Sequence, residues 1–206
     1  ILFRGGKHIR ILGSQLVLRG SVMLNIVRTS LGGTGQMIIA TTSWIFLLRI
    51  LASIGSEAVA GATIGIRIMM FTLMPAWGMS NAAATLVGQN LGAQQPERAT
   101  AAVWRIGWYN MVFTLSVSVL FFFFHDRIVA IFSDDARVIA IGGEWLRILS
   151  YSYFVYGWWM VSVQAYNGAG DTMTPTWINL VFFWMIQIPL SWLLAIQLGW
   201  QHSGVF

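Results

Sequence analysis

Five long runs without Asp, Glu, Lys or Arg limit what this chain can fold into. A helix that crosses the ~30 Å hydrocarbon core of a bilayer needs about 20 mostly apolar residues. Each run reaches or nearly reaches that length: residues 29–48, 68–96, 106–124, 148–170 and 172–206. The pattern predicts an all-α fold, a polytopic bundle of membrane-spanning helices.

The composition excludes an ordinary water-soluble domain. Of the 206 residues, 57% are hydrophobic and only 9% are charged, whereas soluble domains average about 45–50% apolar and about 25% charged residues. The mean hydropathy is +0.70. The sequence has no cysteine, which excludes disulfides and thiol chemistry. Its three histidines lie far apart in the sequence, so we expect no metal site.

Charged residues between the runs set the expected ends of the helices. Residues 1–28 are expected to form a cytoplasmic lead-in, either with an amphipathic helix on the membrane surface or as a plain linker. Five transmembrane helices are expected over residues 29–54, 57–91, 97–124, 134–167 and 172–198, with the start of a sixth at 204–206. This organisation indicates a piece of a longer protein.

Basic residues concentrate on one side of this topology. If the lead-in is cytoplasmic, the cytoplasmic segments hold Arg4, Lys7, Arg10, Arg19, Arg28, Arg98 and Arg105, and the outer loops hold Arg127 and Arg137. Cytoplasmic loops are rich in Lys and Arg. The turns GAQQPER and NGAGDTMTP are therefore expected on the cytoplasmic side of a cell inner membrane.

Residues typical of helix ends occupy both turns. Gly92 is expected to end the second helix, and Pro96 to stand in the first turn of the third. Asp171 or Thr172 is expected to cap the fifth helix, with Pro175 in its first turn. The residues expected to shape these turns, or to let helices approach closely through small side chains, are Gly78, Gly88, Gln89, Gly92, Gly168, Gly170, Asp171 and Pro175.

Polar side chains inside the runs need partners or water. Arg67 costs about 3 kcal/mol at the centre of a membrane helix. It is either a cation that lines a cavity or a clamp on backbone carbonyls, and we favour the clamp because charged side chains inside membrane helices usually pair with protein groups. Asn81 must face protein or a water-filled cavity. Gln89 and Asn90 are expected to cap the end of the second helix.

Aromatic rings attract cations through their faces, and methionines offer an adaptable surface to varied ligands. Tyr156 lies deep in the fourth expected helix, with Gln164 further along it. Tyr and Trp also occur at membrane interfaces, so an interfacial or packing role remains an alternative. The candidate pathway residues are Gln36, Thr41, Arg67, Met70, Asn81, Tyr156 and Gln164.

Several sequence blocks resemble the multidrug and toxic compound extrusion (MATE) family. They are PAWGMSNAAATLVGQNLGA followed by PERA, then NGAGDTMTP, and finally GWQHSGVF. Family members have twelve helices in two lobes, and the resemblance places this chain at the second lobe, from the seventh helix to the start of the twelfth. It implies export of cationic, amphiphilic compounds in exchange for Na⁺ or H⁺.

The resemblance also implies where the coupling ion binds. In members of the NorM type, carboxylates in the first and fourth helices of this lobe bind the coupling cation. The matching residues here, 36–44 and 154–164, include no Asp or Glu. We therefore expect the ion in the missing first lobe, and we expect Glu144 to pair with Arg147 on the same helix face. No cofactor is expected.

The expected partners are the lipid bilayer, the first lobe and small organic cations, and not nucleic acid. A lipid-linked oligosaccharide flippase of the same superfamily is the alternative function, but only Arg67 is a candidate to bind an anionic head group. An intramembrane enzyme is not supported, because the sequence has no GxSxG or HExxH motif.

Overall fold

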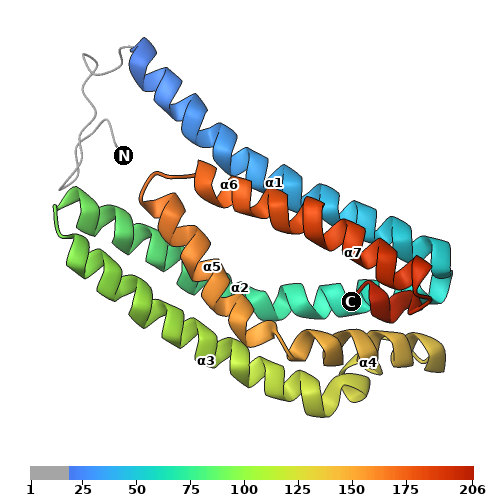
Figure 1. The fold of residues 1–206 in the computed structure, drawn as a ribbon. Coiled ribbons are helices and arrows are strands. Elements are labelled where there is room, and N and C mark those ends of the chain that lie inside the picture. Colours follow the sequence, from blue (N-terminus) through green and yellow to red (C-terminus); the bar gives the residue numbers. More distant parts are fainter. Residues whose placement is uncertain (1–18) are drawn as a thin grey trace, which may run out of the picture.

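Helices are the regular structure throughout residues 19–206, the part of the chain that the computed structural model describes (Figure 1). In chain order the elements are α1 (Gly20–Ile54), α2 (Ser56–Gly92), α3 (Pro96–Val129), α4 (Ala136–Ser150), α5 (Tyr153–Gly168), α6 (Met173–Asn179), η2 (Leu180–Gln187), α7 (Ile188–Trp192), η3 (Leu193–Gln197) and η4 (Gln201–Gly204). Most of the expected lead-in lies outside the described residues. Its last part, residues 20–28, belongs to α1, so that helix begins earlier than predicted.

The helices form two groups. α2, α3, α4 and α5 pack against one another, and α1 lies along one flank of this group with α6 and α7 (Figure 1). Small residues on α2 permit the close packing. A methyl group at Gly65 would overlap the indole ring of Trp145 on α4, and one at Gly61 would lie 2.9 Å from the Gly142 nitrogen. Close contact at small residues is how membrane helices gain packing energy without a hydrophobic effect between them.

The helix predicted over residues 134–167 is two helices, α4 and α5, separated by a short break. The Ser150 hydroxyl donates to the Arg147 carbonyl at 2.6 Å, and the Ser152 hydroxyl donates to the Leu149 carbonyl at 3.4 Å. Serine hydroxyls that bond to the preceding turn compete with the backbone ladder and bend helices. The prediction of one continuous helix is therefore wrong, because neighbouring serines interrupt it.

The last long helix runs from α6 to η3 as one path with wide turns. Its segments η2 and η3 are π-helical, and Pro189 stands between them in α7. Proline lacks the N–H of the α-helical bond and its ring crowds the preceding turn, so wider turns on either side accommodate it.

The turns GAQQPER and NGAGDTMTP share one end of the bundle, as predicted. A Cβ atom at Gly88 would lie 3.1 Å from the Gly168 carbonyl oxygen, so α2 and α5 end beside each other. The Thr172 hydroxyl donates to the Thr29 carbonyl on α1 at 3.1 Å. The first part of α1 therefore lies at the same end as both turns (Figure 1).

The first of these turns differs in detail from the prediction. α2 ends at Gly92 and α3 begins at Pro96, both as expected. However, the residue in the left-handed conformation is Gln94, with φ of 57°, so Gly92 does not end the helix through backbone freedom. The side chain of Asn90 bonds to the Leu86 carbonyl at 2.7 Å.

Asp171, and not Thr172, caps the last long helix. Its Oδ1 accepts from the Thr174 backbone N–H at 3.0 Å, and its Oδ2 accepts from the Thr174 hydroxyl at 2.6 Å. These bonds, the hydroxyl first, lower the pKa of Asp171 below its ordinary value. Gly170, with φ of 85°, makes the turn before it, and Pro175 lies buried in the first turn of α6.

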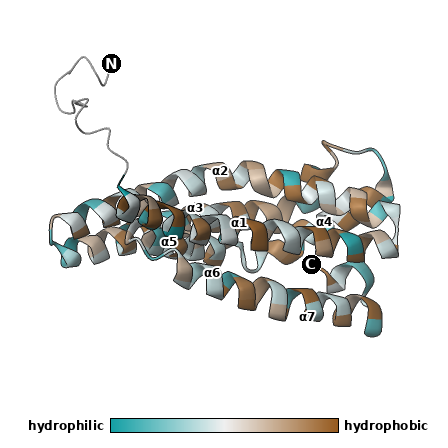
Figure 2. Ribbon diagram, turned by 90° about the horizontal axis from the view of Figure 1, so that it is seen from above, coloured by the Kyte–Doolittle hydropathy of each residue, from teal (hydrophilic) through white to brown (hydrophobic). Residues whose placement is uncertain are grey.

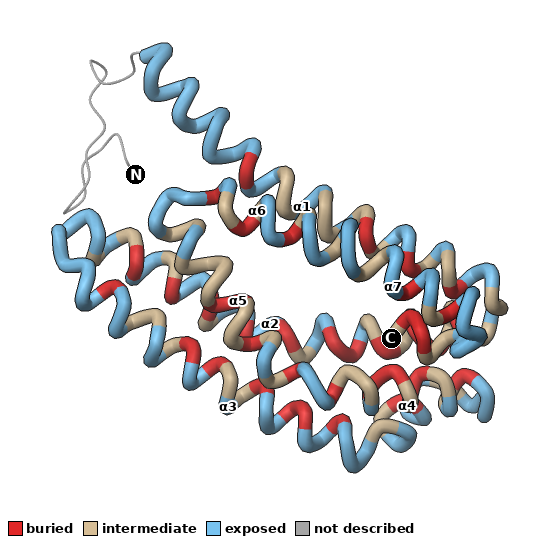
Figure 3. Tube along the Cα trace, viewed as in Figure 1, coloured by how far each residue is buried: buried red, intermediate tan, exposed pale blue. Residues whose placement is uncertain are grey.

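Hydrophobic residues occur along all the long helices (Figure 2), and many large apolar side chains among them are exposed, which suits a protein in lipid. Exposed and buried residues alternate along α2 and α3, whereas the first part of α1 is exposed (Figure 3). Within the described residues, α1, α2, α3 and the path Met173–Gln197 are each long and apolar enough to cross a membrane. The all-α membrane bundle is confirmed, with its fourth predicted span divided between α4 and α5.

Candidate functional site

Four side-chain amides form a hydrogen-bonded chain across three helices. Gln36 Nε2 on α1 donates to Asn167 Oδ1 on α5, and Asn167 Nδ2 donates to Gln164 Oε1, each at 3.1 Å. Gln164 Nε2 then donates to Asn81 Oδ1 on α2, also at 3.1 Å. Gln36 bonds in addition to the Thr172 carbonyl at 3.0 Å. The structure thus brings together three predicted residues, Gln36, Asn81 and Gln164, through Asn167.

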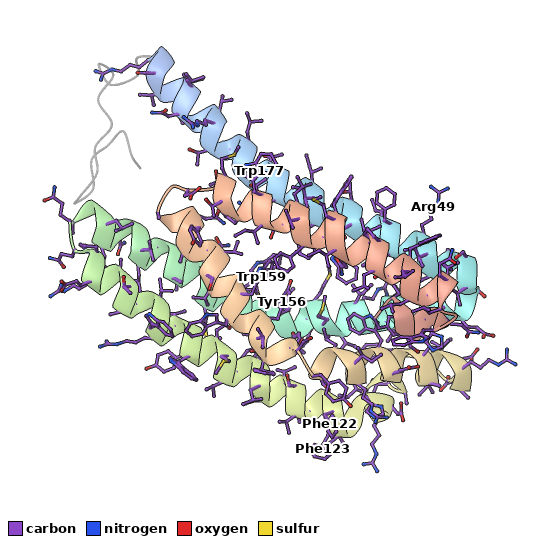
Figure 4. The ribbon with its side chains drawn as sticks, viewed as in Figure 1. Arg49, Phe122, Phe123, Tyr156, Trp159 and Trp177 are labelled. Atoms are coloured by element: carbon purple, nitrogen blue, oxygen red, sulfur yellow. The ribbon has the colours of Figure 1, made fainter. Side chains whose placement is uncertain are left out.

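The exposed surface of α2 mixes polar side chains with large apolar ones such as Phe71, Met74 and Trp77. Arg67, Met70 and Asn81 are all exposed, with Met70 at 57%. The outer face of α3 differs, because it is built almost entirely from large apolar side chains such as Phe122 and Phe123 (Figure 4). Lipid cannot satisfy a guanidinium or an amide. The surroundings of Arg67 on α2 are therefore suited to a polar cavity or a protein partner, and the outer face of α3 is suited to lipid.

No clamp of Arg67 on backbone carbonyls is found within the described part of the chain. The Arg67 side chain forms no hydrogen bond or ion pair with residues 19–206, because its position on α2 directs it away from the packed faces. Thr41 is likewise exposed on α1. Arg67, Met70 and Thr41 therefore stand apart from the amide chain.

A cavity of about 230 Å³ lies between α1, α2, α4, α5 and the last long helix. Aromatic rings form much of its wall: Trp44, Trp145, Tyr156, Trp159, Phe183 and Phe206. The Tyr156 and Trp159 rings lie 5.0 Å apart on α5, and the Trp159 and Phe183 rings lie 6.2 Å apart. Tyr156 and Trp159 lie on the side of α5 toward α6 and α7 (Figure 4).

Polar groups in this cavity are few and neutral. The Ser43 hydroxyl lies 3.2 Å from Gln187 Oε1, to which it donates, and Asn179 and Tyr156 also contribute to the lining. None of the described lining residues carries a charge. The cavity therefore offers the faces of aromatic rings and neutral dipoles. These groups suit an organic ligand that does not require an oppositely charged side chain for binding.

Glu144 pairs with residues that sequence reasoning did not select. Its carboxylate contacts His202 Nε2 at 2.9 Å and accepts from the Ser203 hydroxyl at 2.6 Å. The predicted pair with Arg147 is absent among the described ion pairs, since Arg147 is exposed. The spacing within one helix could not show that η4 would return to α4.

The glycines predicted to pack helices behave differently from one another. A Cβ atom at Gly168 would overlap the backbone of Ala84, so α5 and α2 touch there. Gly78 is exposed, and a Cβ atom placed on it would have no neighbour within 4 Å; its predicted packing role is not found. Gln89 is exposed, and its side chain caps nothing within residues 19–206.

Asn110 is a buried polar residue that the sequence analysis missed. It is 0% exposed on α3, and its Nδ2 donates to the Gly157 carbonyl at 2.8 Å and to Ser80 Oγ at 3.2 Å. It therefore ties α3 to α5 and α2. An amide in the middle of an otherwise apolar run was the signal that could have identified it.

No group of three or more His, Asp or Glu residues in the described part of the chain could hold a metal ion.

Comparison with known proteins places this geometry in a family. The MatE family model matches residues 34–193. The chain is 28% identical over 177 residues to "Probable multidrug resistance protein NorM" of Thermotoga maritima, covering 84% of this chain and 38% of that protein. It is 22% identical over 186 residues to "Probable multidrug resistance protein YoeA" of Bacillus subtilis, covering 90% and 40%.

Solved structures share the fold. The crystal structure of a mutant of the Vibrio cholerae MATE transporter VcmN superposes with a TM-score of 0.87 at 20% identity, covering 95% of this chain and 45% of that one. An outward-facing MATE transporter superposes with a TM-score of 0.81 at 16% identity, covering 88% and 40%. The chain spans about two fifths of the length of the curated relatives it matches. It belongs to the MatE family and is part of a multi-pass protein of the cell inner membrane.

Proposed function

We propose that this chain forms part of the second lobe of an efflux antiporter that exports cationic, amphiphilic compounds in exchange for H⁺ or Na⁺. The observation that carries the proposal is the uncharged cavity walled by aromatic rings. Ring faces attract organic cations, and no fixed cation in the described lining opposes them. The relatives named as multidrug resistance proteins support the same reading.

A cationic substrate fits the cavity better than an anionic lipid-linked sugar. An anionic head group would need basic residues, and the described lining supplies none. Arg67 is exposed on α2 and does not line the cavity. We therefore favour drug export over the flippase alternative.

We propose that the acid for ion coupling lies outside this chain, in the first lobe. Exchange requires that binding of the coupling ion and binding of the drug are linked in free energy. The described cavity lining and the amide chain contain no carboxylate, and Glu144 already bonds to His202 and Ser203.

Ethidium efflux by the full-length transporter in inverted membrane vesicles tests the cavity. Tyr156→Leu removes a ring, and a cation–π contact is worth about 0.5–2 kcal/mol, so the apparent affinity for ethidium should fall about 2- to 30-fold. Tyr156→Phe retains the ring and should restore most of it. Phe123→Leu, at a 69% exposed site on α3, is the matched control and should have no effect.

An unchanged apparent affinity in a folded Tyr156→Leu protein would remove the cavity from the pathway. Collapsing the proton gradient and the sodium gradient separately in the same vesicles identifies the coupling ion. Export that continues when both gradients are collapsed together would contradict the proposed antiport.

A further inference from the structure

A second recess lies on the outside of the bundle, between α1 and the end of the last long helix. It measures about 580 Å³ and is lined from α1 by Phe46, Arg49, Ile50 and Ser53, and from the facing helix by Ile188, Pro189, Trp192 and Ile196. We call it the Arg49 groove. Its walls are apolar except for Arg49 and Ser53, and the wide turns around Pro189 help to shape it.

Arg49 has no partner in the described part of the protein. It forms no ion pair with residues 19–206, whose carboxylates in ion pairs are Glu57, Asp126 and Glu144. The neighbouring Ser53 hydroxyl donates to the Ile50 carbonyl at 2.7 Å, so its proton is already used. The Arg49 side chain is exposed and points away from the bundle (Figure 4).

The depth of Arg49 suits the boundary between hydrocarbon and head groups. It lies five residues before Ile54, where α1 ends, which corresponds to about 7 Å along the helix axis. A long arginine side chain extends from such a position to the interface. Trp192 lines the same groove, and tryptophan is enriched at that level of the membrane.

We propose that the Arg49 groove binds an anionic membrane phospholipid. The guanidinium of Arg49 would bind the phosphate through paired N–H donors, and an acyl chain would lie along Phe46, Ile50, Trp192 and Ile196. The apolar walls favour a lipid over free phosphate, which would leave them in contact with water. The absence of any carboxylate among the described groove residues favours an anionic ligand over a cationic one. This inference rests on membrane insertion and is independent of the transported substrate.

Lipid binding to the delipidated full-length protein tests the proposal. Dioleoyl phosphatidylglycerol and dioleoyl phosphatidylcholine are titrated separately, and bound lipid is counted by native mass spectrometry. Arg49→Gln should weaken phosphatidylglycerol binding about fivefold, the contribution of one basic residue near an anionic lipid, and leave phosphatidylcholine unchanged. Arg49→Lys should retain most of the binding.

Two further variants separate charge from shape. Arg147→Gln removes an exposed arginine from α4, outside the groove, and should leave phosphatidylglycerol binding unchanged. Ile196→Trp fills the groove and should weaken phosphatidylglycerol binding although Arg49 remains. Glycerol 3-phosphate should not compete; competition at low concentration would show that the site takes phosphate alone. Equal losses in Arg49→Gln and Arg147→Gln, or no loss in either, would overturn the proposal.

Discussion

Gln164 on α5 donates a hydrogen bond to Asn81 on α2 across 3.1 Å, and this bond joins the two motif regions of the sequence. Asn81 belongs to the block GMSNAAATLVGQNLGA and Gln164 precedes the block NGAGDTMTP. The two blocks are thus neighbours in space, at the end of the bundle where α1, α2 and α5 meet.

Breaking this bond should destabilise the contact between α2 and α5. Gln164→Leu also leaves Asn167 without one partner. The net contribution of one hydrogen bond to the stability of the fold is about 1 kcal/mol. A double-mutant cycle with Asn81→Leu, followed by SDS-induced unfolding of the full-length protein, should give a coupling energy of about 0.5–1.5 kcal/mol. Gln89→Leu, which removes an exposed amide, should change stability by less than about 0.5 kcal/mol. A coupling energy near zero would mean that the amides act independently.

Substitutions at two glycines should show which of them is needed for close helix packing and which only matches the sequence of the family. Gly168→Ala forces a methyl group against the backbone of Ala84, which should cost about 1–3 kcal/mol. Gly78→Ala meets no atom within 4 Å and lies inside α2, so it should be neutral or stabilise the helix by up to about 1 kcal/mol. The melting temperatures of the two variants measure the difference. If both lose stability equally, the helix contact is not the cause.

Arg67→Leu should leave the stability of the protein nearly unchanged, because Arg67 has no bond to the described residues. Its effect should appear in transport, as an altered preference between monovalent and divalent organic cations, because its charge acts from the exposed face of α2 and not from the aromatic cavity. The melting temperature and a competition assay with the two classes of cation check both parts. A melting temperature lowered by many degrees with unaltered selectivity would instead assign Arg67 a structural partner outside this chain.

Glu144→Gln should weaken the contact between α4 and η4 without uncoupling export. The charged acceptor of the His202 and Ser203 bonds becomes a neutral amide, and a loss of about 1 kcal/mol is expected. Arg147→Gln, which does not touch Glu144, is the control. Gradient-driven ethidium export should persist in both variants. Uncoupled transport by a folded, inserted Glu144→Gln protein would move the coupling acid into this lobe.

Asp171 should titrate below an ordinary aspartate. Hydrogen bonds from Thr174, first from its hydroxyl and then from its N–H, lower the pKa of Asp171. Because the folded pKa lies below the unfolded value of about 3.9, the carboxylate stabilises the fold above that pH, and this contribution is lost as the pH falls through the folded pKa. Thr174→Val should raise the pKa of Asp171 toward the ordinary value, as followed by NMR with ¹³C-labelled aspartate. An ordinary pKa of Asp171 in the unsubstituted protein would contradict the capping bonds from Thr174.

The sequence predicted the membrane bundle because length and apolarity of a run decide membrane insertion locally. It also predicted that the two turns share one end of the bundle. The uncharged runs alternate with short segments that contain Gly, Pro and charged residues, and every second one of these segments lies on the same side of the membrane. The break between α4 and α5 was missed because Ser150 and Ser152 compete for backbone carbonyls only in a particular side-chain conformation. Hydropathy cannot register that competition.

Contacts between distant segments were the other limit. Gln36 and Asn167 are 131 residues apart, and Glu144 and His202 are 58 apart, so neither pair has a local signature. The i, i+3 spacing of Gln164 and Asn167 was the one local hint to the amide chain. The surroundings of Arg67 could not be predicted for a related reason, because the sequence of α2 does not reveal which of its faces the neighbouring helices cover.

The break between α4 and α5 has a mechanical consequence. α5 is a single short helix that carries both Tyr156 of the cavity and Gln164 of the amide chain. α4 is anchored separately, through Glu144 to His202 and Ser203. A rotation of α5 about Ser150 and Ser152 would therefore alter the cavity wall and the amide chain together, and it would also strain the bond from Asn110 to the Gly157 carbonyl.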